Sequence, residues 1–433
     1  MLAAQRAAFA HQPPDAPRRI RALRALLKAV RARREEFVQA ISEDFGGRAR
    51  QETLLLEVFP LVDSIRHAIR QLPQWMRPRP AAAGWQFLPG RARVVYQPLG
   101  VVGIIGAWNY PLLLSLSPMV SALAAGNHVM LKPSELAPRT ADLLARLVSD
   151  LFPADYVTVV TGGPETGAAF AALPYDHMLF TGSTRVGKLI MRSASEHLTP
   201  VTLELGGKSP AIVFPDADLD LAIAGTASAI FYNQGQCCTA GSRLFAHTSV
   251  YDRVVNGVVA EAGKLKIGHG LDPTVNLGPL VSKEQHNRVT GFIESGRNEG
   301  AEVVVGGKTG NGRGYFVEPT VLAKTNRDMR VVREEIFGPV VCVQSFDDED
   351  LDAVAKFAND TEYGLQASVW TQNLRVAHTM ARKIKAGTIC INTHNYGDPA
   401  WPFGGFKQSG WGREMGKEVM EHYTETKSVA ARL

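Results

Sequence analysis

Short runs of apolar and β-branched residues alternate with helix-like segments between residues 99 and 205. Each run ends in or near Gly, Pro or Ser, and the runs read "VVGIIGA", "HVMLKP", "YVTVVTGG" and "HMLFTGS". This alternation predicts the strands of a parallel sheet joined by helical crossovers. The region from about 207 to 405 repeats the pattern at "SPAIVF", "AEVVVGG", "VVCVQSF", "ASVWT" and "GTICINT". The chain is therefore expected to have an α/β fold with two sheet regions.

The pattern differs at the two ends of the chain. The pattern predicts one helix over residues 14–45 and a second helical region over 51–76. Residues 77–100 are rich in Pro and Gly, which predicts a connector with a strand at "ARVVYQP". The final "YTETKSVAARL" predicts a strand that pairs with 92–97 or with another subunit. The most apolar stretch, 99–126, is broken by Asn109, Pro111 and Pro118, which favours a buried strand, loop and helix over a membrane span.

Composition and charge narrow the function classes. The 433 residues are 45% hydrophobic and 21% charged, with a net charge of +5, as expected for a soluble globular protein. The arginines of 18–37 recur at helical intervals without a nucleic-acid motif, so we expect a solvated helix face and no nucleic-acid partner. The first residues lack a signal-peptide pattern, and four cysteines make no disulfide framework, so we expect a cytoplasmic protein.

The segment "NQGQCCTAGSR", 233–243, contains two of the four cysteines side by side. Adjacent cysteines form a strained disulfide, and the spacing is not that of a metal site, so we expect no metal. The small residues around Cys238 suggest a turn entering a helix, where backbone N–H groups stabilise a thiolate and later an oxyanion. The alternative is a pair of buried structural cysteines.

Two further side chains are candidates for catalysis. Glu204 lies in "VTLELGGKSP", where it either pairs with Lys208 or acts as a general base whose pKa an apolar pocket raises. Asn109 lies in "GAWNYP", where its amide either caps a turn or donates to a developing oxyanion.

A dinucleotide site is suggested by two other strand ends. In "LKPSE", Lys132 and Glu135 either belong to a helix cap or clamp the hydroxyls of a ribose. In "FTGSTRVGK", 180–188, a Gly-Ser turn precedes a helix whose N-terminus could hold a pyrophosphate.

Taken together, these motifs resemble the NAD(P)-dependent aldehyde dehydrogenase superfamily over essentially the whole chain, with "EEIFGPV" (334–340) and "PFGGFKQSGWGRE" (402–414) as further matches. The resemblance implies a Rossmann-like cofactor domain, an α/β catalytic domain and a small bridging or oligomerisation region. The expected ranges are 1–80 and 98–206 for the cofactor domain, 207–415 for the catalytic domain, and 81–97 and 416–433 for the bridging region.

The resemblance also implies a role for each motif residue. Cys238 would be the nucleophile, Glu204 the general base and Asn109 the oxyanion donor, with Cys237 a packed neighbour. The cofactor-binding residues would be Trp108, Lys132, Glu135, Gly182, Ser183, Glu335 and Phe337.

The implied reaction oxidises an aldehyde to a carboxylic acid through a cysteine thiohemiacetal and a thioester. Glu135 should repel a 2′-phosphate, so NAD is the expected cofactor, with NADP also accepted. A coenzyme A-acylating dehydrogenase is the alternative, and the presence of Glu204 argues against it. A cysteine hydrolase would need a His partner, and no motif ties one to the thiol.

The two halves resemble different branches of the superfamily. The N-terminal half is similar to class 3 and coniferyl aldehyde dehydrogenases, and the half from about 225 onward to class 1 and 2 enzymes, which suggests a recombinant of two branches. Long relatives place a Lys where this chain has Pro118, so the proton-relay pairing of Glu414 is lost.

We expect a homodimer or homotetramer. Aromatic walls for the aldehyde are expected from Tyr110, Phe231, Trp401 and Phe403.

Overall fold

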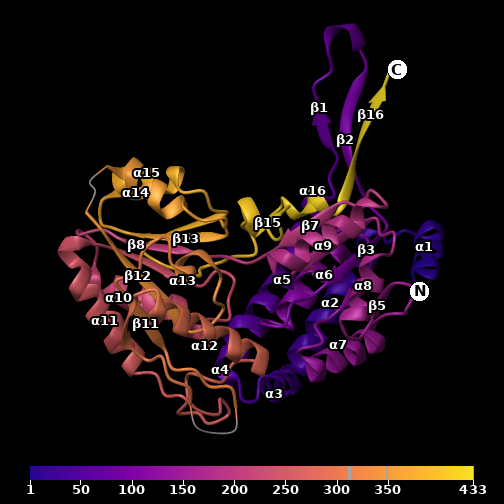
Figure 1. Ribbon diagram of the computed structural model, residues 1–433. Helices are drawn as coiled ribbons and strands as arrows, with labels where there is room; N and C mark the ends of the chain where they lie inside the picture. The colour runs from indigo at the N-terminus through magenta and orange to yellow at the C-terminus, as the bar shows by residue number, and fades with distance from the viewer. Residues whose placement is uncertain (311–313, 348–349, 433) are drawn as a thin grey trace.

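The computed structural model describes residues 1–310, 314–347 and 350–432, which form two lobes and a projecting arm (Figure 1). One lobe is built on a six-stranded sheet, the other on a seven-stranded sheet, and the arm on a three-stranded sheet. The expected α/β architecture is confirmed.

The six-stranded sheet has the strand order β15-β7-β6-β3-β4-β5. Its parallel strands are β3 (Val101–Ile105), β4 (His128–Lys132), β5 (Val157–Val159), β6 (His177–Thr181) and β7 (Val201–Glu204), and antiparallel β15 (Gly410–Trp411) adds an edge. Every residue of β3 and β4 is buried, because helices cover both faces of a parallel sheet. The chain order reverses between β3 and β6, and such a switch point is where open parallel sheets bind ligands.

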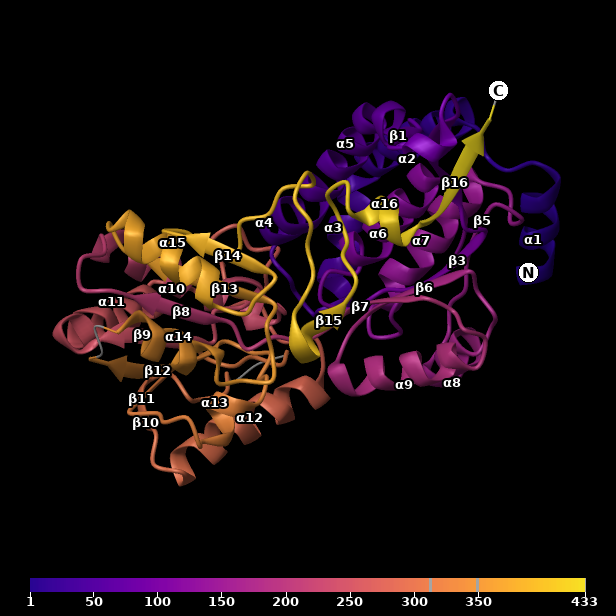
Figure 2. The same cartoon turned by 90° about the horizontal axis from the view of Figure 1, so that it is seen from above.

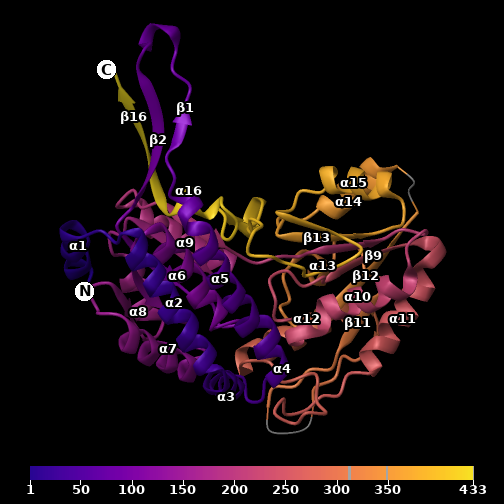
Figure 3. The ribbon, with the colours of Figure 1, turned by 180° about the vertical axis from the view of Figure 1, so that it is seen from behind.

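Helices from the first half of the chain pack around this sheet (Figure 3). They are α1 (Leu2–His11), α2 (Ala16–Ala32), α3 (Arg34–Asp44), α4 (Arg50–Thr53), α5 (Phe59–Trp75), α6 (Leu113–Ala125), α7 (Pro138–Leu151), α8 (Pro164–Ala171) and α9 (Thr184–Ser195). The prediction of one helix over 14–45 is wrong, because Arg33 leaves the helical conformation and separates α2 from α3. The apolar 99–126 stretch forms β3, a loop and α6, as expected. No helix in the described residues is long and apolar enough to span a bilayer.

The seven-stranded sheet has the order β10-β11-β12-β9-β8-β13-β14, and only β10 is antiparallel to its neighbour. Its strands are β8 (Pro210–Val213), β9 (Arg243–His247), β10 (Glu302–Val305), β11 (Thr320–Ala323), β12 (Val340–Phe346), β13 (Gln366–Trp370) and β14 (Thr388–Ile391). Its helices are α10 (Leu219–Phe231), α11 (Tyr251–Gly263), α12 (Lys283–Asn298), α13 (Arg330–Arg333), α14 (Leu351–Asn359) and α15 (Leu374–Lys383). The first two cover one face of the sheet and the last two the other.

The arm consists of β1 (Arg79–Ala81), β2 (Arg91–Pro98) and the C-terminal β16 (Thr424–Ala431), which follows the short helix α16 (Val419–His422). β16 pairs with β2 in antiparallel register from Thr424 opposite Pro98 to Ala431 opposite Arg91. The expected pairing of the C-terminal strand with 92–97 is therefore confirmed within one chain. The segment before β15 runs from the second lobe across to β7, and so joins the two sheets (Figure 2).

Candidate active site

The two adjacent cysteines lie in a tight turn between α10 and β9. Before them, Asn233, Gln234 and Gly235 have φ angles of 48°, 55° and 67°, so three successive residues are left-handed. A Cβ on Gly235 would lie 2.0 Å from the carbonyl oxygen of Gly338, which only glycine avoids. The expected helix after the pair is absent, because residues 239–242 lead directly into β9.

The two thiols have different surroundings. Cys237 is 6% exposed and makes hydrogen bonds with the hydroxyls of Tyr232 (2.8 Å) and Thr239 (3.1 Å), whereas Cys238 is partly exposed. Burial acts to raise the pKa of Cys237, but hydrogen bonds with Cys238, Thr239 and Tyr232 outweigh it and lower that pKa to about 6. The hydrogen bond with Cys237, followed by burial, raises the pKa of Cys238. The pair therefore titrates as a unit, and Cys238 is its accessible sulfur.

Asn109 reaches this turn from the carboxyl end of β3. Its side chain is 4% exposed, and Nδ2 donates to the backbone oxygen of Gln236 at 3.1 Å, directly before the cysteine pair. The amide thus bonds across 127 residues of sequence instead of capping its own turn. Because an amide carries two N–H donors, the second stays available for an oxyanion on Cys238.

Glu204 ends β7 and is 7% exposed. In the described part of the chain, neither of its carboxylate oxygens nor the ammonium of Lys208 has a hydrogen-bond partner, so the alternative of a Glu204–Lys208 pair is wrong. Burial, followed by the charge of Glu414, raises the pKa of Glu204 well above its usual range. A Cβ on Gly404 would lie 2.8 Å from Glu204 Oε1, so the "PFGG" loop closes over this carboxyl group.

Gly206 and Gly207 connect the Glu204 strand end to the nucleophile turn. The N–H of Gly207 donates to Glu335 Oε1 at 2.9 Å, and burial raises the pKa of Glu335 to about 7. A Cβ on Gly206 would lie 2.3 Å from Glu335 Oε2, and one on Gly207 would lie 2.2 Å from the carbonyl oxygen of Cys238. The Gly-Gly pair is therefore required for these three segments to approach each other.

Lys132 and Glu135 form an ion pair at the carboxyl end of β4. Lys132 is 2% exposed, and its Nζ lies 3.1 Å from Glu135 Oε2. The helix-cap alternative is wrong, because α7 begins only at Pro138 and Glu135 bonds the ammonium group. The pair occupies the sheet edge where a ribose clamp is expected.

The Gly-Ser turn lies at the end of β6, which pairs with β3 on the side away from β4. Ser183 is the N-cap of α9 and accepts the N–H of Val186 at 3.4 Å, and the N–H of Gly182 donates to the Glu204 backbone oxygen at 3.0 Å. The open N-terminus of α9 is thus beside the strand that carries Glu204, and helix N-termini favour phosphate groups.

Trp108 and Phe337 come together from the two lobes. Their ring centroids are 5.2 Å apart in an edge-on arrangement, and Phe337 has a φ of 62°. The structure therefore brings these two cofactor-site candidates into direct contact.

One functional-site neighbour was not found from the sequence. His394 lies beside the nucleophile turn, with Nε2 2.9 Å from the Thr239 oxygen and Nδ1 2.8 Å from the Ser368 hydroxyl. Burial lowers its pKa to about 4. Both ring nitrogens are engaged, so the thiol–imidazole pair of a cysteine hydrolase is not formed.

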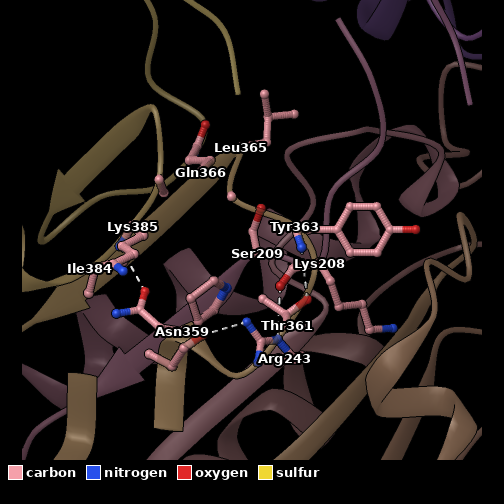
Figure 4. A pocket seen from close by; sticks show the side chains of 14 residues that line it. Lys208, Ser209, Arg243, Asn359, Thr361, Tyr363, Leu365, Gln366, Ile384 and Lys385 are labelled. Atoms are coloured by element: carbon pink, nitrogen blue, oxygen red, sulfur yellow. Dashed lines mark hydrogen bonds between the residues drawn. The ribbon is translucent and has the colours of Figure 1, made fainter. Parts of the chain in front are cut away.

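A small pocket adjoins the site at the backbone of Lys208 (Figure 4). Inside it, Arg243 donates to the carbonyl oxygens of Lys208 (2.9 Å) and Ala358 (2.8 Å), and burial lowers the pKa of Lys208 to about 8. None of the predicted catalytic or cofactor-binding residues lines this pocket. It is therefore separate from the candidate active site.

Two of the expected aromatic substrate walls are buried beside the cysteine pair. Tyr110 and Phe231 are 7% and 3% exposed and pack with Cys237 in the core of the second lobe. Trp401 is 49% exposed, and its ring lies 5.7 Å from that of Tyr396.

Residues 1–429 match the model of the aldehyde dehydrogenase family, and the chain belongs to this family. It is 45% identical to aldehyde dehydrogenase 1A1 of Oryctolagus cuniculus over 342 residues, which cover 78% of this chain and 68% of that relative. An NAD+ complex of an aldehyde dehydrogenase from Bacillus cereus has a TM-score of 0.94 at 41% identity, covering 100% of this chain and 88% of that one. A P. syringae indole-3-acetaldehyde dehydrogenase complex with NAD+ and IAA has a TM-score of 0.95 at 37% identity, with the same coverage.

The chain is an oxidoreductase that oxidises aldehydes with NAD. The coenzyme A-acylating alternative is not favoured by these relatives, which are named as aldehyde dehydrogenases.

Proposed function

We propose that Cys238 is the nucleophile of this reaction, Asn109 the oxyanion donor and Glu204 the general base. The observation that carries the proposal is the convergence of two strand ends, those of β3 and β7, on one turn. Asn109 bonds the carbonyl directly before the cysteine pair, and the Gly-Gly after Glu204 touches the backbone of Cys238.

The residues then act in sequence. The Cys238 sulfur adds to the aldehyde carbon, and the second amide N–H of Asn109 stabilises the thiohemiacetal oxygen, which is worth about 3 kcal/mol in the transition state. A bound NAD would supply the hydride acceptor for oxidation of the thiohemiacetal, which leaves Cys238 as a thioester. Glu204, as carboxylate, removes a proton from water that attacks the thioester, which releases the acid and restores the thiol.

The residues around the sheet edge fit a dinucleotide. Lys132 and Glu135 would contact the adenosine ribose, Gly182 and Ser183 the pyrophosphate, and Glu335 with Phe337 and Trp108 the nicotinamide side. Glu135, partly exposed beside a buried ammonium, opposes a 2′-phosphate, so NAD is preferred and NADP is accepted less well.

The finer assignments also belong to the proposal. The cofactor domain comprises 1–80 and 98–206, the catalytic domain 207–415 and the bridging region 81–97 and 416–433. The three sheets support this division except at β15, which lies within 207–415 but joins the six-stranded sheet. The proposal also includes a homodimer or homotetramer formed through the arm. It further includes a cytoplasmic location, which suits the four free cysteines. Light scattering measures the assembly.

The test replaces each cysteine in turn. Cys238→Ser should lower NADH formation from every aldehyde in a panel by at least about 10³-fold, because an alcohol is a far weaker nucleophile than a thiolate. The matched control, Cys237→Ser, should retain most of the activity. Full turnover in Cys238→Ser, or loss confined to Cys237→Ser, contradicts the assignment.

A further inference from the structure

Arg48 is a fully buried arginine that the proposed reaction does not use. Its side chain is 0% exposed, and Nη1 donates to Glu57 Oε1 at 2.7 Å and to the backbone oxygen of Asn109 at 3.2 Å. Its guanidinium lies 5.2 Å from the ring centroids of both Phe45 and Tyr110. Arg48 therefore holds the backbone of the oxyanion donor and the ring of the next residue.

Glu57, its partner, holds the same loop a few residues further on. Its second oxygen, Oε2, accepts the N–H groups of Leu112 (2.8 Å) and Leu113 (3.1 Å), where α6 begins without a side-chain cap of its own. A carboxylate at a helix N-terminus satisfies donors that the helix leaves open. The loop carrying Asn109 is thus fixed at both ends by one ion pair.

Glu52 extends the network to the nucleophile turn. Its Oε1 accepts the N–H of Asn233 at 2.7 Å, and its Oε2 accepts the side-chain amide of Gln234 at 3.1 Å. These are the left-handed residues before the cysteine pair, a conformation that costs free energy outside glycine. The Asn233 amide in turn donates to the Asn109 oxygen (3.4 Å) and the Gln236 oxygen (3.1 Å), which ties the two loops together.

The backbone between the two glutamates explains how one short segment serves both loops. Leu54–Val58 form a π-helical turn, in which hydrogen bonds join residues five apart. Glu52 and Glu57 are five apart, whereas an ideal α-helix would set their side chains about 140° from each other. The wider turn brings both carboxylates toward one side of the segment, and α4 lies at the boundary of the two lobes in Figures 2 and 3.

From these contacts we propose that Arg48, Glu52 and Glu57, here named the α4 clamp, are positioning residues that hold Asn109 and the Cys238 turn in register for addition to the aldehyde. The hydrogen bonds described above join the clamp to two stretches of the chain. One stretch lies within four residues of Asn109 in the sequence, and the other lies within five residues of Cys238. A buried ion pair stabilises a fold no better than apolar side chains of the same volume do. Stability alone therefore does not explain the Arg48–Glu57 pair, whereas a positioning role does. The inference rests on the proposed roles of Asn109 and Cys238.

The test is a double-mutant cycle on kcat/KM for aldehyde oxidation. Arg48→Lys keeps the charge opposite Glu57 but loses the planar guanidinium that lies over the rings of Phe45 and Tyr110, and should lower kcat/KM by about 10- to 100-fold. Asn109→Ala should lower it by about 10²- to 10³-fold. The double variant should lie within about 3-fold of Asn109→Ala, because Arg48 bonds the backbone of Asn109 and acts through the amide that is already gone.

A merely structural role would not produce this coupling. If the two losses multiply, the clamp is contradicted and the role of Asn109 stands; if Asn109→Ala alone loses nothing, the proposed function of Asn109 fails first. Glu52→Ala, at a partly exposed position that leaves the buried ion pair intact, should lower kcat/KM by itself, because it releases Asn233 and Gln234 before the cysteine pair; an unchanged kcat/KM would remove Glu52 from the clamp. The matched control is Arg19→Lys, a buried arginine on the carbonyls of Pro14 and Ala124, whose loss in kcat/KM, if any, should multiply with that of Asn109→Ala.

Discussion

Glu57 and Glu204 are both buried, with exposed fractions of 0% and 7%, but their carboxylates differ in how many hydrogen bonds they accept. Both oxygens of Glu57 are bonded, one to Arg48 and the other to two backbone N–H groups. In the part of the chain described by the structure, Glu204 has no hydrogen-bond partner at either oxygen. A fully bonded carboxylate is fixed, whereas an unbonded one keeps its lone pairs for water. The contrast separates the carboxylate proposed to hold the site from the one proposed to act in it.

Glu414 lies between these extremes. It accepts the hydroxyl hydrogens of Tyr423 at 2.7 Å and Ser121 at 3.4 Å, and burial raises its pKa to about 8. Pro118, one turn before Ser121 in α6, occupies the position where long relatives were expected to have a Lys. The hydroxyls therefore take the place of a cationic partner, and Glu414 keeps its negative influence on Glu204.

The largest expected effect comes from exchanging the charge of each carboxylate for an amide. Glu204→Gln should lower kcat by about 10²- to 10⁴-fold, since it removes the base, and leave the melting temperature nearly unchanged. Glu57→Gln should lower the free energy of unfolding by about 3–5 kcal/mol, because it leaves Arg48 buried without a counter-charge. Steady-state kinetics and urea unfolding measure the two effects.

The comparison fails if the effects are exchanged. A Glu204→Gln protein that is strongly destabilised, or a Glu57→Gln protein of full stability, would mean that bonding in the structure does not separate the two roles. Glu302→Gln, on the exposed ion pair with Lys324, is the control, and should change neither quantity appreciably.

The next effect concerns pH. Burial first, and then the charge of Glu414, raises the pKa of Glu204, and the base must be deprotonated to act. Activity therefore rises with pH through the pKa of Glu204. Glu414→Gln removes the repelling charge, so the acid limb of the kcat–pH profile should move to lower pH. An unmoved limb, or one displaced to higher pH, would contradict the coupling of the two carboxylates.

Sequence motifs mark the residues proposed to act in catalysis, but not those proposed to position them. Cys238, Glu204 and Asn109 stand in short motifs, so their chemistry can be read locally. Arg48 and Glu57 bond backbone groups 61 and 55 residues away, and backbone partners leave no residue signature in a sequence. The one available signal was a Glu in the apolar run "LLLEVF".

The same reasoning explains how much of the fold was predictable. The strands β3 and β4 are buried throughout and were located by their apolar runs. The break between α2 and α3 at Arg33, in contrast, carries no Gly or Pro to mark it. The helix expected after Cys238 was wrong because residues 239–242 lead directly into β9. The left-handed turn before the cysteine pair was not predicted, because Asn233 and Gln234 bond Glu52, a distant partner. The recombinant origin of the chain stays a hypothesis.

The smallest expected effect is on stability and uses Glu414 alone. Its pKa is about 8 in the folded protein against 4.5 as the ordinary value, so between these values the folded chain binds a proton that the unfolded chain has released. The free energy of unfolding must then decrease as pH rises through this window. Glu414→Gln carries no charge at any of these pH values, so its decrease should be smaller than that of the unmodified protein. Urea unfolding at about pH 5, 6, 7 and 8 measures the difference. Parallel curves for the two proteins would show that Glu414 ionises as readily in the folded state as in the unfolded chain, and would place it with fixed, charged Glu57.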